Sequence, residues 1–397
     1  MTTEVGGEYL ALARKYRPQN FEDVVGQEHV LKALAHSIDT NRTHHAYLLT
    51  GTRGIGKTTI ARIFAKALEC EKGVSSHPCG ECDACKAIIA GVFPDVVEID
   101  AASQTKVDDT RQLLENTQYP PLKARYKIYI IDEVHMLSTS SFNALLKTLE
   151  EPPAYVKFIL ATTDPHKIPS TVLSRCLQFQ LRALSLDEIS HQLQKVCGLE
   201  NVKYSQEAIQ ALARAARGSM RDALSLCDQA IALGHGELEA ATVYSMLGTI
   251  GDVLITDILG LLSTPPAAQA ASAAQAAPVA PTADALDLGA VLKKIREKSP
   301  NYKSLLDELL LVFHDLAMYQ MLGANTHLEV FSFSTSMLDS FARKFDPQQI
   351  QLYYQIVLEG LQEYPYATDG RAAFEMTLLR LLAFTPLKKN FLGEKTS

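Results

Sequence analysis

The sequence predicts an α/β protein in which a parallel sheet carries a phosphate-binding loop and helical regions follow. Three observations predict this. An apolar run, Ala46–Leu49, leads as a strand into Gly51–Thr58, which has the form G-x-x-x-x-G-K-[ST]. A second apolar run, Lys127–Ile131, ends in Asp132–Glu133, as expected of a strand buried on both faces of a parallel sheet. Beyond residue 185 the apolar residues recur at helical spacing.

Composition narrows the class of protein. The 397 residues are enough for two or three domains, and 47% hydrophobic with 21% charged residues is typical of a chain that buries cores. The net charge of −7 argues against a surface that binds nucleic acid everywhere, so any such contact needs a local basic stripe. Without a signal pattern or a long apolar stretch, we expect a cytoplasmic protein with no membrane contact.

The first segment, Leu10–Phe21, is basic and aromatic, and Pro18 fixes an extended or turning backbone there. Asp23–Gln27 then opens a helix. A proline and aromatic loop ahead of a phosphate-binding loop could wall off an adenine base, which makes Pro18 and Val25 candidate adenine contacts. Composition supports a surface arm packed on the sheet equally well.

The glycine-rich loop predicts a nucleoside triphosphate site. Its glycines let successive backbone N–H groups face a phosphate, Lys57 reaches the β- and γ-phosphates, and Thr58 offers its hydroxyl to Mg²⁺. The helix after the loop begins at an end that favours anions. The alternatives are a chance glycine turn and a site that binds nucleotide without hydrolysing it. The predicted nucleotide contacts are Gly51, Thr52, Arg53, Gly54, Ile55, Gly56, Lys57, Thr58 and Thr59.

Four cysteines, Cys70, Cys79, Cys82 and Cys85, follow the loop helix with the spacing C-x₈-C-x₂-C-x₂-C. In a reducing compartment such spacing indicates metal rather than disulfides. Four thiolates suit a closed tetrahedral Zn²⁺ site, and a full ligand set leaves no position for a catalytic water. An iron–sulfur cluster and four unconnected thiols are the alternatives. The scattered Cys176, Cys197 and Cys227 are predicted to be packing residues.

The acidic pair at the end of the second strand predicts hydrolytic chemistry. Asp132 would hold Mg²⁺, and Glu133 would polarise the water that attacks the γ-phosphate. A solvated strand end is the alternative, but it leaves a buried apolar run ending in charge without a partner. After a helix over Ser140–Leu149, the strand Val156–Thr163 ends in hydroxyls that could contact the γ-phosphate. Arg175 is either a surface ion pair or a charge offered to a phosphate.

The ordered set of motifs resembles the AAA+ ATPases of bacterial sliding-clamp loaders, in particular the tau/gamma family of the DNA polymerase III holoenzyme. That family carries KYRP-x-x-F-x-D-V-x-G-Q, the phosphate loop, four zinc cysteines, IDE-x-H-M-L, FNALLKTLEEPP, LATTDP, SRC and GS-x-RDALSL-x-DQAI. Besides the loop and the cysteines, the matching segments are Lys15–Gln27, Ile131–Leu137, Phe142–Pro153, Leu160–Pro165, Ser174–Cys176 and Gly218–Ile231.

The resemblance implies roles for individual residues. Arg175 matches the arginine finger that completes a neighbouring subunit's ATP site, Arg221 the sensor-2 arginine of the lid, and Thr163 the sensor-1 position. Three further positions match basic residues that track DNA through the ring, although each could be a solvated helix face. Gln104 stands where the family can have a basic residue, which would shorten the track. The three basic positions are Lys106, Arg111 and Lys147.

The resemblance also implies the domain organisation. An AAA+ nucleotide-binding domain would span 1–182 with a zinc module at 70–85, a helical lid 183–248, a helical collar 249–388 and a tail 389–397. Within the collar, Ser263–Thr282 is rich in Ala, Pro and Gln and reads as an inserted flexible loop with no assigned function. The predicted collar helices lie near Ser304–Met321, Gln348–Leu361 and Arg371–Phe384.

The function implied is an ATPase motor subunit that uses ATP, Mg²⁺ and a structural Zn²⁺. Its partners would be further copies of itself and delta-like and delta-prime-like subunits in a five-subunit ring, the sliding clamp and primed DNA. The main alternative is an architectural clamp-loader subunit that does not hydrolyse ATP, and the intact loop and acidic pair argue against it. A branch-migration helicase would not be expected to carry the four-cysteine insert.

Overall fold

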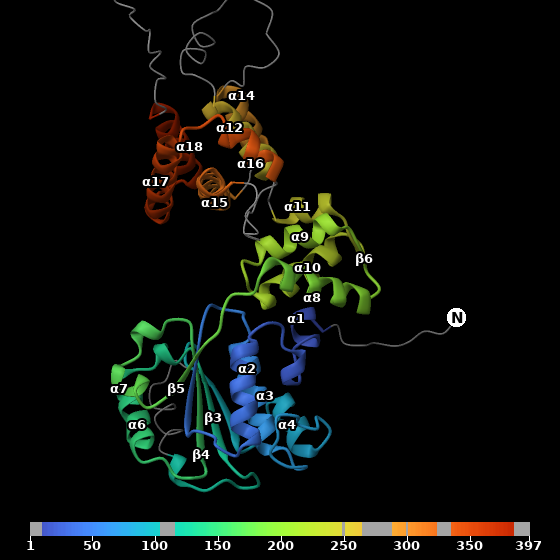
Figure 1. Cartoon of the computed structure of the whole chain (residues 1–397), viewed down its shortest axis with the longest axis vertical. Coiled ribbons are helices and arrows are strands. Elements are labelled where there is room, and N and C mark those ends of the chain that lie inside the picture. The colour runs from blue at the N-terminus through green and yellow to red at the C-terminus, as the bar shows by residue number, and fades with distance from the viewer. Residues whose placement is uncertain are drawn as a thin grey trace, which may run out of the picture. The chain divides into compact units, whose positions relative to one another are not determined.

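The structure, a computed structural model, describes residues 10–103, 116–247, 251–263, 288–298, 301–323 and 335–384. The chain divides into two compact units, Met1–Val243 and Tyr244–Ser397 (Figure 1). Several predicted features lie outside the described residues: Gln104, Lys106, Arg111, the insertion beyond Ser263 and the 389–397 tail.

The first unit is built on a five-stranded sheet whose paired strands all run parallel, in the order β2-β3-β4-β1-β5. The register pairs Thr50 with Thr162 and Asp100 with Asp132, so the carboxyl ends of neighbouring strands meet at one edge. The predicted α/β class with a parallel sheet is therefore confirmed. The strands are β1 (Ala46–Thr50), β2 (Val96–Asp100), β3 (Lys127–Asp132), β4 (Val156–Thr162) and β5 (Leu177–Gln180).

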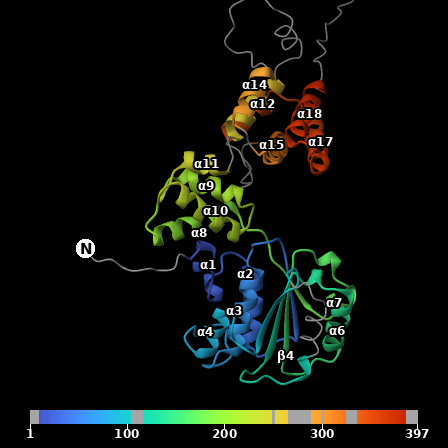
Figure 2. The same ribbon diagram turned by 180° about the vertical axis from the view of Figure 1, so that it is seen from behind.

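Helices cover both faces of this sheet, as the two opposite views show (Figures 1 and 2). Because strand side chains alternate between faces, Leu49 and Ile130 pack toward α2 and α3, whereas Leu48 and Ile131 pack toward α6 and α7. The predicted burial of Ile128–Ile131 is confirmed. The helices around the sheet are α2 (Glu28–Asp39), α3 (Lys57–Glu69), α4 (Asp83–Ala90), α6 (Thr139–Glu150) and α7 (Ser170–Leu173), with short 3-10 turns η2 (Asn116–Gln118), η3 (Val134–Met136) and η4 (Pro165–Lys167).

The N-terminal segment is a short helix, α1 (Leu12–Lys15), then an irregular stretch and the 3-10 turn η1 (Phe21–Asp23). This segment contacts the helical region after β5 as well as the sheet domain. The Leu12 N–H donates to Asp228 of helix α10 at 3.2 Å, and Lys15 pairs with Glu200 at 2.5 Å. Only its end, at Phe21, enters the core beside α2 and α3. We call residues 10–21 the N-terminal arm.

A buried amide clamps the chain where the sheet ends. Gln27, fully buried and in the left-handed region at φ +66°, donates from Nε2 to the Arg182 carbonyl at 2.7 Å and accepts the Arg182 N–H on Oε1 at 3.0 Å. The segment after β5 is thereby fixed to the start of α2.

A helical subdomain follows the sheet, and its last helix runs past the end of the first unit at Val243. Its first helix starts with a capping box in which Ser185 and Glu188 satisfy each other's backbone N–H groups. The prediction of purely helical structure over 185–247 is wrong in one respect, because β6 (Lys203–Tyr204) and β7 (Glu237–Leu238) pair in parallel. Strands of two residues leave no periodic pattern to detect. The helices are α8 (Leu186–Leu199), α9 (Gln206–Ala215), α10 (Met220–Leu233) and α11 (Ala240–Leu247).

The second unit is helical and has one core, in which Phe313, Tyr353 and Phe374 are fully buried. The three helices predicted here are confirmed as α15 (Tyr302–Leu322), α17 (Pro347–Glu363) and α18 (Gly370–Ala383). Among the described residues, no helix has the length and apolar character that crossing a bilayer demands. The run Asp252–Leu262, which the sequence predicts as the first helix of this unit, is confirmed as α12 (Gly251–Ser263). Elements that the sequence analysis did not name are α14 (Leu288–Lys298), α16 (Thr335–Ala342) and η5 (Tyr364–Tyr366).

Candidate nucleotide-binding site

The glycine-rich loop connects the carboxyl end of β1 to the first turn of α3, as predicted. Gly56 caps the helix at φ +104°, a conformation that side chains rarely adopt, and this turns the loop so that Lys57 points back into it. The Lys57 ammonium donates to the carbonyls of Gly51 at 2.8 Å and Thr52 at 2.9 Å. Burial lowers the pKa of Lys57, and the nearby Glu133 and Asp132 charges oppose that shift. The loop therefore presents a desolvated cation beside a helix N-terminus, which suits a phosphate.

The two predicted magnesium ligands are in direct contact. The Thr58 hydroxyl donates to Asp132 Oδ2 at 2.6 Å, and Asp132 Oδ1 accepts the Glu133 N–H at 3.0 Å. A hydroxyl and a carboxylate at the mouth of a phosphate loop are hard oxygen ligands, the type that Mg²⁺ prefers. These side chains fit the predicted ion.

Glu133 is held by the neighbouring strand end. Its backbone is left-handed at φ +46°, and its Oε2 accepts the Thr163 N–H at 3.1 Å and the Thr163 hydroxyl at 2.8 Å. His135 lies beside them, with Nδ1 3.4 Å from Glu133 Oε2 and 2.9 Å from the Thr162 hydroxyl. Sequence reasoning assigned His135 no role, although a histidine two residues after the acidic pair was the available signal. The structure thus brings Glu133 and Thr163 together.

The helical subdomain reaches the loop through α10. The Arg221 backbone N–H donates to the Gly54 carbonyl at 3.2 Å. The backbone of the predicted lid arginine is therefore in direct contact with the phosphate loop of its own chain. Gly54 has φ +79°, and a β-carbon placed there would lie 2.0 Å from the Ser219 hydroxyl oxygen. Only glycine fits between the loop and the start of α10.

Gly54→Ala should therefore destabilise the first unit. The left-handed backbone alone costs an alanine about 1–2 kcal/mol, and relief of the clash must turn the Ser219 hydroxyl away from the Asp222 N–H that it caps at the start of α10. We expect a lower melting temperature and weaker binding of a fluorescent ATP analogue. The control is Gly198→Ala, because Gly198 sits in α8 with nothing near its missing β-carbon, and alanine there should be neutral or gain up to about 1 kcal/mol. Equal melting temperatures for the two variants would contradict the close contact.

Arg17 is a site residue that the sequence analysis did not name. Its Nε donates to the Thr59 hydroxyl at 3.1 Å, in the first turn of α3. Burial is the main cause that lowers the pKa of Arg17, and the charges of Arg62 and Arg221 lower it further. The charges of Glu98 and Asp132 oppose this shift, and Arg62 is already paired with Glu98 at 2.7 Å, so Arg17 itself is the candidate phosphate contact here. The signal was a basic residue directly before Pro18.

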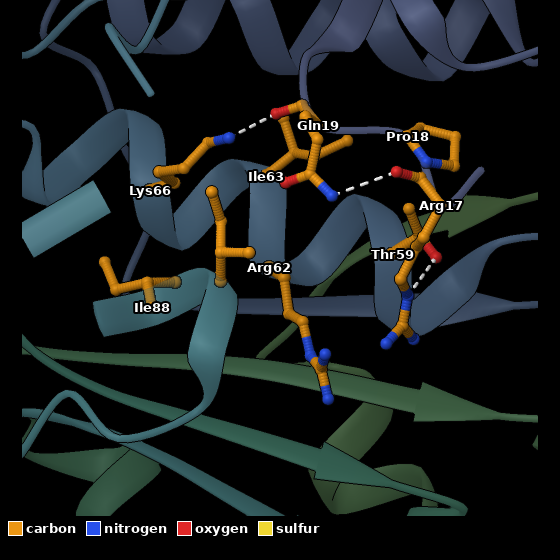
Figure 3. A pocket seen from close by; sticks show the side chains of 9 residues that line it. Arg17, Pro18, Gln19, Thr59, Arg62, Ile63, Lys66 and Ile88 are labelled. Carbon is orange, nitrogen blue, oxygen red and sulfur yellow. Dashed lines mark hydrogen bonds between the residues drawn. The ribbon is translucent and has the colours of Figure 1, made fainter. Parts of the chain in front are cut away.

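The remaining predicted nucleotide contacts differ in burial and in position around the loop. Pro18 and Thr59 line one pocket with Arg17 (Figure 3). Ile55 is buried in the core next to α3, Arg53 is exposed, and Val25 is half-buried. The adenine contacts stay a prediction.

Arg175 lies elsewhere. Its guanidinium donates to the Thr171 carbonyl at 2.8 Å and to Glu150 at 2.9 Å, and its side chain is 34% exposed. Within the described part of the chain, none of its hydrogen bonds or ion pairs reaches the phosphate loop. This is the surface ion pair that the sequence allowed as an alternative, in a position open to another molecule. Lys147 is exposed on α6.

The four cysteines form one cluster, with all Sγ atoms within 4.8 Å of one another and Cys79 and Cys85 3.9 Å apart. Tetrahedral zinc with bonds of about 2.3 Å would require a sulfur separation of about 3.8 Å. Backbone N–H groups of Cys79, Cys82 and Cys85 point at neighbouring sulfurs at 3.4 Å, and such donors lower the pKa of Cys79 to about 6. The donor set fits a tetrathiolate metal site. Outside it, Cys197 and Cys227 are fully buried and Cys176 packs against the core, as predicted.

Comparison with known proteins adds the family. Three protein families match consecutive segments: "DNA polymerase III, delta subunit" over residues 26–185, "DNA polymerase III clamp loader subunit, ATPase lid domain" over 188–236, and "DNA polymerase III subunits gamma and tau domain III" over 238–390. RuvB of Thermotoga maritima, a solved branch-migration motor, shares 20% identity over 65% of this chain and 85% of its own, with a TM-score of 0.45. Agreement this low carries no argument about activity.

Individual relatives agree with the family matches. The chain is 51% identical to the tau subunit of DNA polymerase III from Escherichia coli over 95% of its own length, and it spans 56% of that relative. It is 41% identical to the gamma subunit from Buchnera aphidicola subsp. Baizongia pistaciae, covering 94% of this chain and 96% of the relative. The chain therefore belongs to the tau/gamma subunit family of the DNA polymerase III clamp loader.

Proposed function

We propose that this chain is the ATP-hydrolysing motor subunit of a clamp loader, which opens a sliding clamp and places it on primed DNA. The observation that supports this best is the meeting of Lys57, Thr58, Asp132, Glu133 and Thr163 at one sheet edge, with Thr58 and Asp132 in contact at 2.6 Å. A non-hydrolysing architectural subunit would not need this complete set. The chain spans about half of the length of the Escherichia coli relative.

Each group has a defined task in the proposed reaction. The loop N–H groups and Lys57 bind the β- and γ-phosphates, while Thr58 and Asp132 hold Mg²⁺, which when bound neutralises charge on those phosphates. Glu133 orients the attacking water once it leaves its hydrogen bonds to Thr163. Arg221 binds the nucleotide of its own chain, and Arg175 acts on the site of the neighbouring subunit.

The proposed assembly is a ring of five subunits in the cytoplasm, with further copies of this chain and with delta-like and delta-prime-like subunits. The second, helical unit would form its collar. Lys106, Arg111 and Lys147 would follow the phosphate backbone of DNA through the ring, which would make binding weaker at higher salt. Of these three residues, Lys147 lies in the described part of the chain and is exposed on α6.

ATP turnover tests the function directly. The chain is assayed alone and mixed with its clamp-loader partners, with and without clamp and primer-template. We expect turnover to rise when the ring assembles and to rise again with clamp and DNA together, because binding energies are linked through subunit geometry. Turnover that stays at background in every mixture, from protein that still binds ATP, would favour the architectural subunit.

The cysteine cluster is proposed to hold a structural Zn²⁺ ion. Elemental analysis of the purified chain should find one zinc per chain, and Cys82→Ser should lower that content because it removes one of four ligands. The control is Cys176→Ser, a cysteine outside the cluster that should leave the zinc content unchanged. Iron with absorbance in the visible range would instead indicate the iron–sulfur alternative.

A further inference from the structure

Lys66 is a buried cation whose role the nucleotide site leaves unexplained. It lies near the end of α3 with 2% of its surface exposed, and its ammonium donates to the Gln19 carbonyl of the N-terminal arm. Burial lowers the pKa of Lys66, and the charges of Cys85, Asp23, Cys79 and Cys70 oppose that shift. A buried ammonium is costly unless anions lie nearby. Three of the four cluster cysteines are among the groups that can supply this charge.

The same arm leads back to the phosphate loop. The Gln19 side chain donates from Nε2 to the Arg17 carbonyl at 3.0 Å, and Arg17 donates to the Thr59 hydroxyl at 3.1 Å. Figure 3 shows these bonds in sequence, from Lys66 through Gln19 and Arg17 to Thr59, across one pocket. Ile88 and Ile89 of α4, the helix that contains Cys85, line the other wall. Lys66 thus lines one pocket together with α4, the helix that contains Cys85, and with the arm residue Arg17 that contacts Thr59.

We propose that Lys66 is a positioning residue that couples metal occupancy of the cysteine cluster to nucleotide binding. A tetrathiolate Zn²⁺ site carries a net charge of about −2, which stabilises the ammonium and keeps it buried. Buried Lys66 holds the Gln19 main chain, and the arm then keeps Arg17 against Thr59. Loss of the metal removes that charge, so Lys66 moves toward water and releases the arm. The inference rests on the proposed function, specifically on nucleotide and zinc binding.

The test compares the wild type with Lys66→Met, which keeps the length of the side chain and removes its charge. Affinity for a fluorescent ATP analogue is measured on zinc-loaded and chelator-stripped protein, and zinc retention by competition with a chromogenic chelator. Stripping the wild type should weaken nucleotide binding about 5- to 10-fold, a typical coupling between sites. Zinc-loaded Lys66→Met should bind the nucleotide analogue as weakly as the stripped wild type does. It should also lose zinc about 10-fold more readily than the wild type, because it lacks an outer-shell partner of the metal site.

Lys86→Met is the matched control, because Lys86 is an exposed lysine of α4 directly after Cys85. It should behave as the wild type in both assays. Gln19→Ala provides a second test that leaves the core intact, since the Gln19 side chain is exposed. It should retain zinc normally and bind nucleotide roughly 3-fold more weakly, as expected from one lost hydrogen bond.

Two results would overturn the coupling. One is a zinc-loaded wild type that binds the analogue and keeps the same affinity after stripping. The other is normal nucleotide affinity in Lys66→Met or, should that variant fail to fold, in Gln19→Ala. A zinc-loaded wild type that binds no nucleotide at all would count against the proposed function instead, so the two failures are distinguishable.

Discussion

Lys57→Ala should abolish ATP binding at ordinary nucleotide concentrations. Lys57 is buried, with 5% of the residue surface exposed, and its loss removes charge-assisted hydrogen bonds to phosphate worth about 1.5–3 kcal/mol each. It also leaves the Gly51 and Thr52 carbonyls without their donor. We expect an affinity for a fluorescent ATP analogue at least roughly 100-fold weaker, measured by titration, and no turnover in the assembled complex.

The matched control is Lys32→Ala, because Lys32 is an exposed lysine of α2. It should bind the analogue as the wild type does. Lys32→Ala should melt as the wild type does, and Lys57→Ala somewhat lower because two carbonyls lose their donor. A single cooperative melting transition in Lys57→Ala then separates loss of binding from loss of folding. Turnover in Lys57→Ala that clamp and DNA still stimulate would remove the loop from the proposed reaction.

Arg175→Ala should leave nucleotide affinity within about twofold of the wild type and lower hydrolysis in the assembled ring by roughly 1000-fold or more, the usual contribution of an arginine finger. The reason is its location, because it contacts Glu150 and Thr171 rather than the phosphate loop of its own chain. Loss of a half-exposed ion pair costs at most about 1 kcal/mol of stability, so the variant should fold. Single-turnover hydrolysis by the reconstituted complex is the measurement.

Lys167→Ala serves as the control for Arg175. Lys167 is exposed shortly before α7 and pairs with Asp164 at 3.1 Å. The Lys167→Ala substitution therefore removes a nearby surface cation and leaves Arg175 unchanged. It should hydrolyse ATP at the wild-type rate. An Arg175→Ala protein that loses nucleotide binding, with assembly intact, would show that the arginine acts in its own subunit.

The features that the sequence predicted well are those encoded in contiguous residues. The phosphate loop, the buried strand ending at Asp132 and the cysteine spacing each carry their geometry locally, because adjacent residues determine a turn, a strand face or a ligand set. Strand ends that are distant in sequence could be placed together only because a parallel sheet aligns its carboxyl ends. That rule is enough to bring Thr163 to Glu133.

The features that the sequence did not predict depend on contacts between distant segments. Arg17 and Lys66 each find partners about 40 or more residues away, at Thr59 and Gln19, and nothing in the local pattern marks Arg17 as half-buried or Lys66 as buried. The β6–β7 pair is too short to show periodicity, and α14 and α16 are short helices whose burial comes from the core of the second unit. Basic side chains in a surface-like sequence are therefore the residues most easily misplaced.

The Gln27 clamp has a mechanical consequence. While its amide holds both the N–H and the carbonyl of Arg182, the chain leaving β5 cannot rotate there relative to the sheet. Arg182 also pairs at 2.5 Å with Glu188 of α8, so this ion pair spans Ala183 and Leu184 and ties the sheet to the helical subdomain. A swing of the α8–α10 subdomain through torsions at Ala183 and Leu184 would therefore have to break this ion pair while the Gln27 clamp stays closed.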